Sequence, residues 1–320
     1  MKIVVPIDNT PAAQSLFDVL MGMQWYEGTE IVLCTVVPKW VAGLDAQVSI
    51  PASVRETESL AVELRNALPL CDVTFFVKEG DPKIEIASFA RSVGAHLIII
   101  GTTPPSPYGQ PQDESIADAI ISHAHCPVLV AKSNYESNVD PQSGFTTVLV
   151  PVDDSIYADI ALQWLLNFRW SPRTRFIISS VVSDESAEAV ASENLLRRAS
   201  LLSTVLQTTN ISMEVRSGNP TEAIISLARK YAADLVVIGS HGRVGLRKLI
   251  FGSVSEDLAH NGPCSIAIVR GIAEADESWH RTGVFRKPKV QQIGETWRQS
   301  PGSYAPSNQG SPHIPPCGMG

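Results

Sequence analysis

Residues 147–155 have the sequence TVLVPVDDS, and residues 2–10 have the related sequence KIVVPIDNT, at an offset of 145. The same offset relates FIISSVV at 176–182 to IVLCTVV at 31–37. Three further pairs of segments repeat at an offset of 138: EGDP at 79–82 with SGNP at 217–220, AHLIIIG at 95–101 with ADLVVIG at 233–239, and SIADAI at 115–120 with SVSEDL at 253–258. Because the offsets stay constant over whole blocks, the chain contains an internal duplication.

Each copy alternates strand-like and helix-like segments. Short runs such as IVVPI and HLIIII are apolar on both faces, which is typical of strands buried between two layers of helices. In the helical pattern TEAIISLARKYAA at 221–233, one face carries Ile224, Ile225, Leu227, Ala228 and Tyr231. The alternation predicts parallel βαβ units with right-handed crossovers. We therefore expect an α/β protein of two tandem Rossmann-like domains, each a five-stranded parallel sheet between helices, with ligands at the carboxyl ends of the strands.

The repeat and the composition divide the chain into four parts. We place a first domain at 1–133, a linker at 134–145, a second domain at 146–270 and a tail at 271–320. The last 21 residues contain 13 Gly, Pro or Ser residues, so the tail is expected to be disordered. A solvated tail is the favoured interpretation, although four of its residues could attract an acidic partner: Arg281, Arg286, Lys287 and Lys289.

The overall charge and hydropathy disfavour two classes of protein. The chain has 25 Lys and Arg residues against 33 Asp and Glu residues, a formal net charge of −8. General nucleic-acid binders are usually basic, so no nucleic-acid partner is expected. No apolar run approaches the roughly 18 residues that a membrane-spanning helix needs, and the apolar stretch in MKIVVPID is too short for a secretory signal. We expect a cytoplasmic protein without a membrane span.

The five cysteines form no C-x-x-C pair, which favours reduced and mostly buried thiols. His123, His125 and Cys126 lie close together in the sequence, but no fourth ligand is evident. We therefore expect no metal site at these residues.

The second copy contains the glycine-rich segment GSHGRVGLRKLIFGSVS at 239–255, which runs from a predicted strand into a predicted helix. Its first glycine allows a sharp turn and lets a ligand approach the backbone. Gly242 and Gly245 allow a loop whose N–H groups point inward as an anion nest. Gly252 and Ser253 begin the next helix, where free N–H groups and the helix dipole favour a phosphate. Positive charge along the loop comes from Arg243, Arg247 and Lys248.

Two polar residues near this segment could act on a bound ligand. Asp153 follows the first strand of the second copy, which would lie beside Gly239 in a sheet wound as predicted. Its carboxylate could bond a sugar or a base, or help to hold a metal ion indirectly. His241 could act as an acid or base, donate a hydrogen bond to phosphate, or face solvent. No Ser-His-Asp arrangement or pair of carboxylates is evident, so we assign no catalytic residue.

The segment resembles the universal stress protein family, whose ATP-binding subgroup carries the motif G-x2-G-x9-G-[ST]. Gly239, Gly242, Gly252 and Ser253 match it without a gap, and the resemblance covers about residues 1–270. It implies adenine-nucleotide α-hydrolase-like domains that bind ATP, with Mg²⁺ held through the phosphates. The contacts that it implies, together with the charge of Arg243, give this candidate set: Pro151, Asp153, Val181, Ile238, Gly239, Gly242, Arg243, Gly252, Ser253 and Val254.

The resemblance also implies a position for each part of the nucleotide. The backbone of Val181 would meet adenine, while Ile238 and Gly239 would line the ribose side. Pro151 and Asp153 would lie at the nucleotide end of their strand. The phosphates would be surrounded by four residues: Gly242, Gly252, Ser253 and Val254.

The first copy departs from the motif. Gly101 and Ser115 remain, but prolines 104 and 107 replace the two loop glycines, and Glu114 replaces the helix-start glycine. Proline has no N–H donor. The carboxylate of Glu114 would stand where a phosphate would bind. Two like charges about 4 Å apart cost about 4 kcal/mol at an effective dielectric constant near 20. We expect this copy to bind no ATP and to act as a structural partner, although Pro6 and Asp8 survive and leave a different small ligand open.

The resemblance implies an arrangement and a function for the two copies together. Family members usually pair their last strands, so 128–133 should lie beside 265–270 in an intrachain pseudo-dimer, with a homodimer as a further option. The expected function is a nucleotide-dependent stress-response or signalling module that acts through protein partners. Two alternatives stay open: a slow ATP-hydrolysing or adenylylating enzyme, and an interaction scaffold without nucleotide. We expect at most a weak ATPase.

Overall fold

The structure is a computed structural model of the protein. It describes residues 1–7, 12–38, 50–102, 116–132, 144–240 and 252–270. The first half contains β1 (Lys2–Pro6), α1 (Ala12–Gly22), β2 (Thr29–Pro38), α2 (Ile50–Ala67), β3 (Cys71–Gly80), α3 (Pro82–Ser92), β4 (Leu97–Thr102), α4 (Ile116–His123) and β5 (Val128–Lys132). The second half contains β6 (Thr147–Pro151), α5 (Ile156–Trp164), η1 (Leu165–Asn167), β7 (Arg175–Val182), η2 (Glu185–Ala187), α6 (Glu188–Leu206), β8 (Ile211–Ser217), α7 (Pro220–Lys230), β9 (Leu235–Gly239), α8 (Ser253–Asn261) and β10 (Ser265–Val269).

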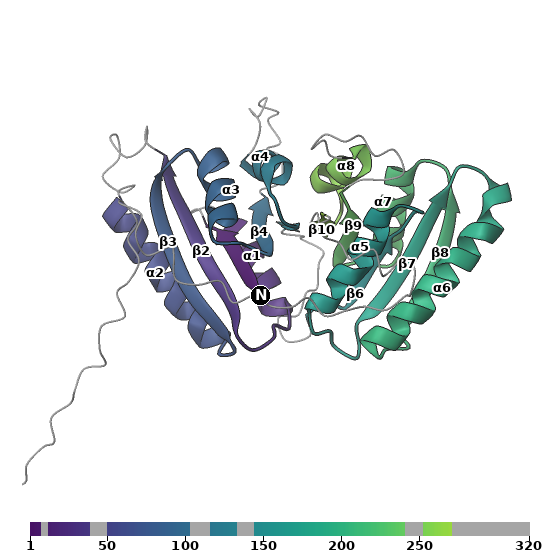
Figure 1. Ribbon diagram of the computed structural model, residues 1–320, viewed down its shortest axis with the longest axis horizontal. Helices are drawn as coiled ribbons and strands as arrows, with labels where there is room; N and C mark the ends of the chain where they lie inside the picture. The colour runs from purple at the N-terminus through teal and green to yellow at the C-terminus, as the bar shows by residue number, and fades with distance from the viewer. Residues whose placement is uncertain (8–11, 39–49, 103–115, 133–143, 241–251, 271–320) are drawn as a thin grey trace, which may run out of the picture.

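The described strands form one sheet of ten, in the order β3-β2-β1-β4-β5-β10-β9-β6-β7-β8 (Figure 1). Within each half the strand pairs are parallel. The halves meet where β5 and β10 pair antiparallel, with Leu129 opposite Ala267. The predicted tandem α/β domains and the predicted pairing of their last strands are confirmed.

Helices cover both faces of the sheet because successive strand residues point to opposite sides. In β9, Leu235 and Val237 belong to the core beneath α1, α2, α5 and α6, whereas Val236 and Ile238 belong to the core beneath α3, α4, α7 and α8. The continuous apolar runs of the strands are therefore explained by burial on two faces.

The helix predicted at 221–233 is shorter than its pattern suggested. It begins at Pro220, after Asn219, whose side chain accepts a hydrogen bond from the backbone N–H of Glu222. It ends at Lys230 because Ala232 has a positive φ of 46°. Ile224, Leu227 and Ala228 are its buried residues, as the amphipathic pattern predicted. Ile225 and Tyr231 are partly buried against the same core.

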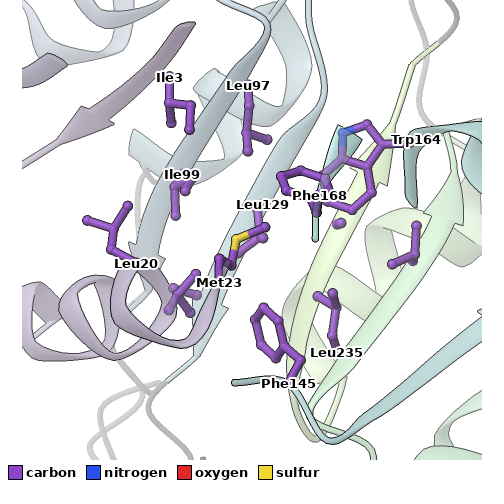
Figure 2. Packing of buried hydrophobic residues seen from close by; sticks show 14 of the residues in the cluster. Ile3, Leu20, Met23, Leu97, Ile99, Leu129, Phe145, Trp164, Phe168 and Leu235 are labelled. Carbon is purple, nitrogen blue, oxygen red and sulfur yellow. The ribbon is translucent and has the colours of Figure 1, made fainter. Parts of the chain in front are cut away.

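A second contact between the halves is aromatic. Phe168 lies 4.5 Å from Trp164, 5.9 Å from Trp25 and 6.0 Å from Trp170, measured between ring centroids in edge-to-face arrangements. Figure 2 shows Phe168 and Trp164 of this cluster beside Met23 and Leu129, which belong to the first half. The backbone N–H of Arg169 also donates to the carbonyl of Gln24 at 3.1 Å. One hydrophobic core therefore runs through both halves.

Several other predictions concern the periphery of this fold. Phe145, which we placed in the linker, is buried in the shared core, and its carbonyl accepts a hydrogen bond from Thr174. The predicted disorder of 271–320 lies outside the described residues. No helix within the described ranges is long and apolar enough to span a membrane. Four cysteines are free and buried, as predicted: Cys34, Cys71, Cys126 and Cys264.

Candidate functional site

The strand order of the second half reverses between β6 and β9, and these two strands part toward their carboxyl ends. They pair through Val148–Leu235 and Leu149–Val236. Farther along, Pro151 pairs with Ser179 of β7 on one side, while Gly239 pairs with Val269 of β10 on the other. Such a point in a doubly wound sheet is where ligands bind. The first half repeats the geometry, since β1 and β4 pair only near their starts.

Asp153 lies two residues after the end of β6, where the chain turns into α5. Its Oδ1 accepts a hydrogen bond from the backbone N–H of Ser155 at 3.0 Å, and the Ser155 hydroxyl caps α5 by accepting from Ala158. The backbone carbonyl of Asp153 accepts a hydrogen bond from Nη2 of Arg198 at 3.1 Å. Asp153 is thus held at the switch point by both its side chain and its backbone.

Arg198 reaches this turn from α6 although it is almost fully buried. Its Nε donates to Oδ1 of Asp159 at 2.9 Å, and both side chains are 9% exposed. A buried guanidinium is tolerated when a carboxylate pairs with it and a carbonyl takes a further donor. The ion pair holds α6 against α5, and the bond to the Asp153 carbonyl holds α6 against the end of β6.

Gly239 ends β9 in close contact with α5. A Cβ built at this position would lie 2.7 Å from both the carbonyl carbon and the carbonyl oxygen of Tyr157. Backbone atoms cannot move aside as a flexible side chain can, so only glycine fits at the observed helix position. Packing of α5 therefore explains this glycine independently of any ligand.

Gly239→Ala is expected to lower the free energy of unfolding by about 1–3 kcal/mol, the usual cost of overpacking. The added methyl group forces α5 away from β9 and disturbs the turn that carries Asp153. Urea unfolding followed by circular dichroism measures the change. A variant as stable as the wild type would show that α5 does not depend on this close approach.

The first turn of α8 combines open backbone donors with a fixed position. Gly252 is the N-cap, and no side chain among the described residues caps this end. The Gly252 N–H donates to the carbonyl of Ser240 at 3.0 Å, and the Ser255 hydroxyl donates to the carbonyl of Gly252 at 2.8 Å. The first N–H groups of a helix lack intrahelical acceptors and carry partial positive charge. The start of α8 is therefore tied to the end of β9 and presents backbone donors of the kind that bind anions.

The structure places several predicted contact residues on the α7/α8 side of the sheet. Val181, Ile238 and Val254 all pack into the core beneath these helices, and the backbone bond between Ser240 and Gly252 joins the two ends of the glycine motif. Ser253 is exposed at the start of α8. Six predicted residues of the loop lie outside the described residues: His241, Gly242, Arg243, Gly245, Arg247 and Lys248.

Ser179 was missed by the sequence analysis. Its hydroxyl is fully buried and has no hydrogen-bond partner among the described residues. Ser179 alternates with Ile178 along β7, so it faces the α7/α8 side, opposite Pro151 in the pairing register. A polar residue inside the apolar run FIISSVV was the available signal. This hydroxyl lies beneath the predicted site and would gain from a polar partner there.

A hollow of about 210 Å³ lies on the other side of the same strand ends, between β6, β7 and α6. Its apolar lining includes Val152, Val182 and Leu195, which belong to the α5/α6 core. Asn194 Nδ2 donates to Asp154 Oδ1 at 3.3 Å within it. The structure therefore separates this hollow from the predicted phosphate contacts by the thickness of the sheet.

The model of the universal stress protein family matches residues 1–132 and 144–270, which are the two halves of the sheet. A universal stress protein of Mycobacterium tuberculosis H37Rv is 26% identical over 192 residues, covering 55% of this chain and 62% of the relative. One from Methanocaldococcus jannaschii is 37% identical over 60 residues, covering 19% of this chain and 35% of the relative. The chain thus spans less than two thirds of the length of these curated relatives.

The fold of both halves has a counterpart among solved structures. The crystal structure of a universal stress protein from Archaeoglobus fulgidus matches 84% of this chain and 98% of its own, with a TM-score of 0.62 and 19% identity. At this identity the likeness shows the fold alone. The match nonetheless spans both copies together, consistent with one sheet built from two repeated units.

Proposed function

The chain belongs to the universal stress protein family, with two copies of the family's domain, and from this premise we propose that residues 146–270 bind one ATP molecule, with Mg²⁺ held through its phosphates. The observation that carries the proposal is the start of α8. Its backbone donors lie at the switch point of the sheet with no side-chain cap among the described residues, and Gly252 and Ser253 complete a G-x2-G-x9-G-S motif there.

The described geometry supports a direction for the bound nucleotide. The phosphates would lie at the N–H groups of Ser253 and Val254, with Gly242 and Arg243 contributing from the loop. Ile238 and Gly239 would line the ribose. The base would lie toward Pro151, Asp153 and Val181, at the carboxyl ends of β6 and β7.

The biological role in this proposal is a cytoplasmic stress-response or signalling module whose nucleotide occupancy is conveyed to protein partners. The first copy supports this interpretation because it keeps the fold but has a proline-containing loop and Glu114 in place of the motif. Any homodimer would need surfaces other than β5 and β10, since these strands already pair with one another.

Isothermal titration calorimetry of the full chain with ATP and Mg²⁺ tests the proposal. We expect one site per chain and a rise in melting temperature with ATP concentration, because a ligand that binds only the folded state stabilises it. Absence of both heat and thermal stabilisation at millimolar ATP would overturn the nucleotide site. Turnover of about 1 per second or faster would instead favour an enzyme.

A further inference from the structure

Lys132, the last residue of β5, crosses from the first half of the molecule into the second. Its Nζ donates to the carbonyls of Gly262 at 2.9 Å, His260 at 3.1 Å and Leu258 at 3.4 Å. These carbonyls lie at the carboxyl end of α8. The last carbonyls of a helix lack intrahelical donors and carry partial negative charge, so an ammonium group there both satisfies and attracts them.

Arg270 makes the mirrored contact in the other direction. It lies 138 positions after Lys132, the same offset that relates the two copies at this end of the domain. Its guanidinium donates to the carbonyls of Ala124 at 2.6 Å and of Ile121, at the carboxyl end of α4 in the first half. Each half therefore places one cationic side chain at the carboxyl end of the last helix of the other half.

The two helices differ in sequence at the amino-terminal end, opposite to the cation. Helix α8 is nine residues long, or about 14 Å at 1.5 Å per residue. One end receives Lys132, and the other end is the start at Gly252, which no side chain of the described residues caps. Helix α4 is held by Arg270 in the same way, but the residue aligned with Gly252 is Glu114. A short helix moves as one unit, so its carboxyl-terminal anchor also sets the position of its first N–H groups.

Further contacts fix α8 against the first half and its own core. His260 Nε2 lies 3.3 Å from Oδ1 of Asp118 on α4. Leu258 is fully buried, and a Cβ at Gly262 would meet the Leu258 carbonyl at 2.5 Å. The carboxyl end of α8 is thus packed at the junction of the halves.

We propose that Lys132 of the first copy is a positioning residue for the phosphate end of the nucleotide site in the second copy. This inference rests on the proposed ATP site. It gives the first copy a task in nucleotide binding that does not require it to hold a nucleotide itself. The pairing of β5 with β10 brings Lys132 to α8, so the affinity for ATP depends on the contact between the halves.

Ionisable groups lie on the elements packed near Lys132. Cys264, just before β10, keeps a neutral thiol, because burial raises its pKa to about 12. His260 lies on α8 and Asp118 on α4. Burial lowers the pKa of Lys132 itself to about 8. Raising the pH from 7 to 9 therefore removes most of its positive charge, whereas an arginine at this position would stay charged.

The first test compares ATP binding by full-length Lys132→Met and Arg270→Met, with circular dichroism to establish that each variant is folded. Lys132→Met should bind ATP about three- to tenfold more weakly than the wild type, in line with the size of charge–helix-dipole effects. Arg270→Met removes an equivalent contact from the other helix and should stay within about twofold, an ordinary spread for such effects. Equal losses in both variants, or no loss in Lys132→Met, would overturn the positioning role while leaving the ATP site intact.

A pH series provides a readout that general loosening would not change. Lys132→Arg should restore the affinity lost in Lys132→Met at pH 7. Between pH 7 and 9 the wild type should lose about threefold more affinity than Lys132→Arg, because at position 132 lysine titrates in this range and arginine does not. Parallel pH profiles for the two proteins would contradict the proposal.

Amide hydrogen exchange separates failure of this inference from failure of the ATP site. If the wild type binds no ATP, exchange of the hydrogen-bonded amides of α8, such as Glu256 and Gly262, still reports its anchoring. Faster exchange in Lys132→Met than in Arg270→Met would show that Lys132 holds α8 although the ATP site is wrong. Equal exchange would overturn the positioning role as well.

Discussion

Gly252→Glu is expected to abolish ATP binding by the full chain, with a loss of affinity of about 1,000-fold. The substitution places a carboxylate at the N-cap of α8, where the phosphates are proposed to lie. Two like charges about 4 Å apart cost about 4 kcal/mol at an effective dielectric constant near 20, which corresponds to roughly 1,000-fold in the dissociation constant. Calorimetric titration with ATP and Mg²⁺ measures the loss.

The backbone at Gly252 makes this experiment interpretable. Its φ of −68° and ψ of 136° are open to any residue, so glutamate introduces a charge without backbone strain. Gly252→Gln has nearly the same size without the charge and should retain most of the affinity. Glu114→Gly removes the corresponding charge from the first copy and should leave binding unchanged at one site. Equal losses in the Gln and Glu variants would show that size, rather than charge, closes the site.

Phe168→Ala is expected to reduce the free energy of unfolding by about 3–5 kcal/mol, the usual cost of removing a buried aromatic ring. Phe168 is 3% exposed and contacts three tryptophans, of which Trp25 comes from the other half of the chain. The loss should therefore weaken the coupling between the halves as well as their total stability. Urea unfolding monitored by tryptophan fluorescence and by circular dichroism should give two separated transitions in this variant.

Phe89→Ala is the matched control, because Phe89 stacks on Phe76 within the first half, with ring centroids 4.1 Å apart. It should lower stability less, since both rings are only partly buried, and should leave the two unfolding probes coincident. A loss below about 1 kcal/mol in Phe168→Ala, smaller than any typical Phe→Ala cost, would contradict a shared core.

The fold was largely predictable because its strands are continuous apolar runs and the repeat supplies each of them twice. The end of α7 was less predictable, since the amphipathic pattern does not change at Ala232, where φ is positive. Gly239 was predicted as a turn and ligand residue, whereas the close approach of Tyr157 became visible only in three dimensions. Lys132 and Arg270 are unremarkable in sequence, because their acceptors lie more than 120 residues away.

The pairing of β5 with β10 inside one chain also has a consequence for assembly. Two separate chains joined by such an edge would dissociate on dilution, whereas a covalent connection gives their contact a fixed effective concentration. In a dimer of identical chains, every substitution appears at both sites at once. Here one loop could acquire Pro104, Pro107 and Glu114 while its counterpart kept all its glycines. Because the copies are joined in one chain, a substitution can alter one half without altering the other.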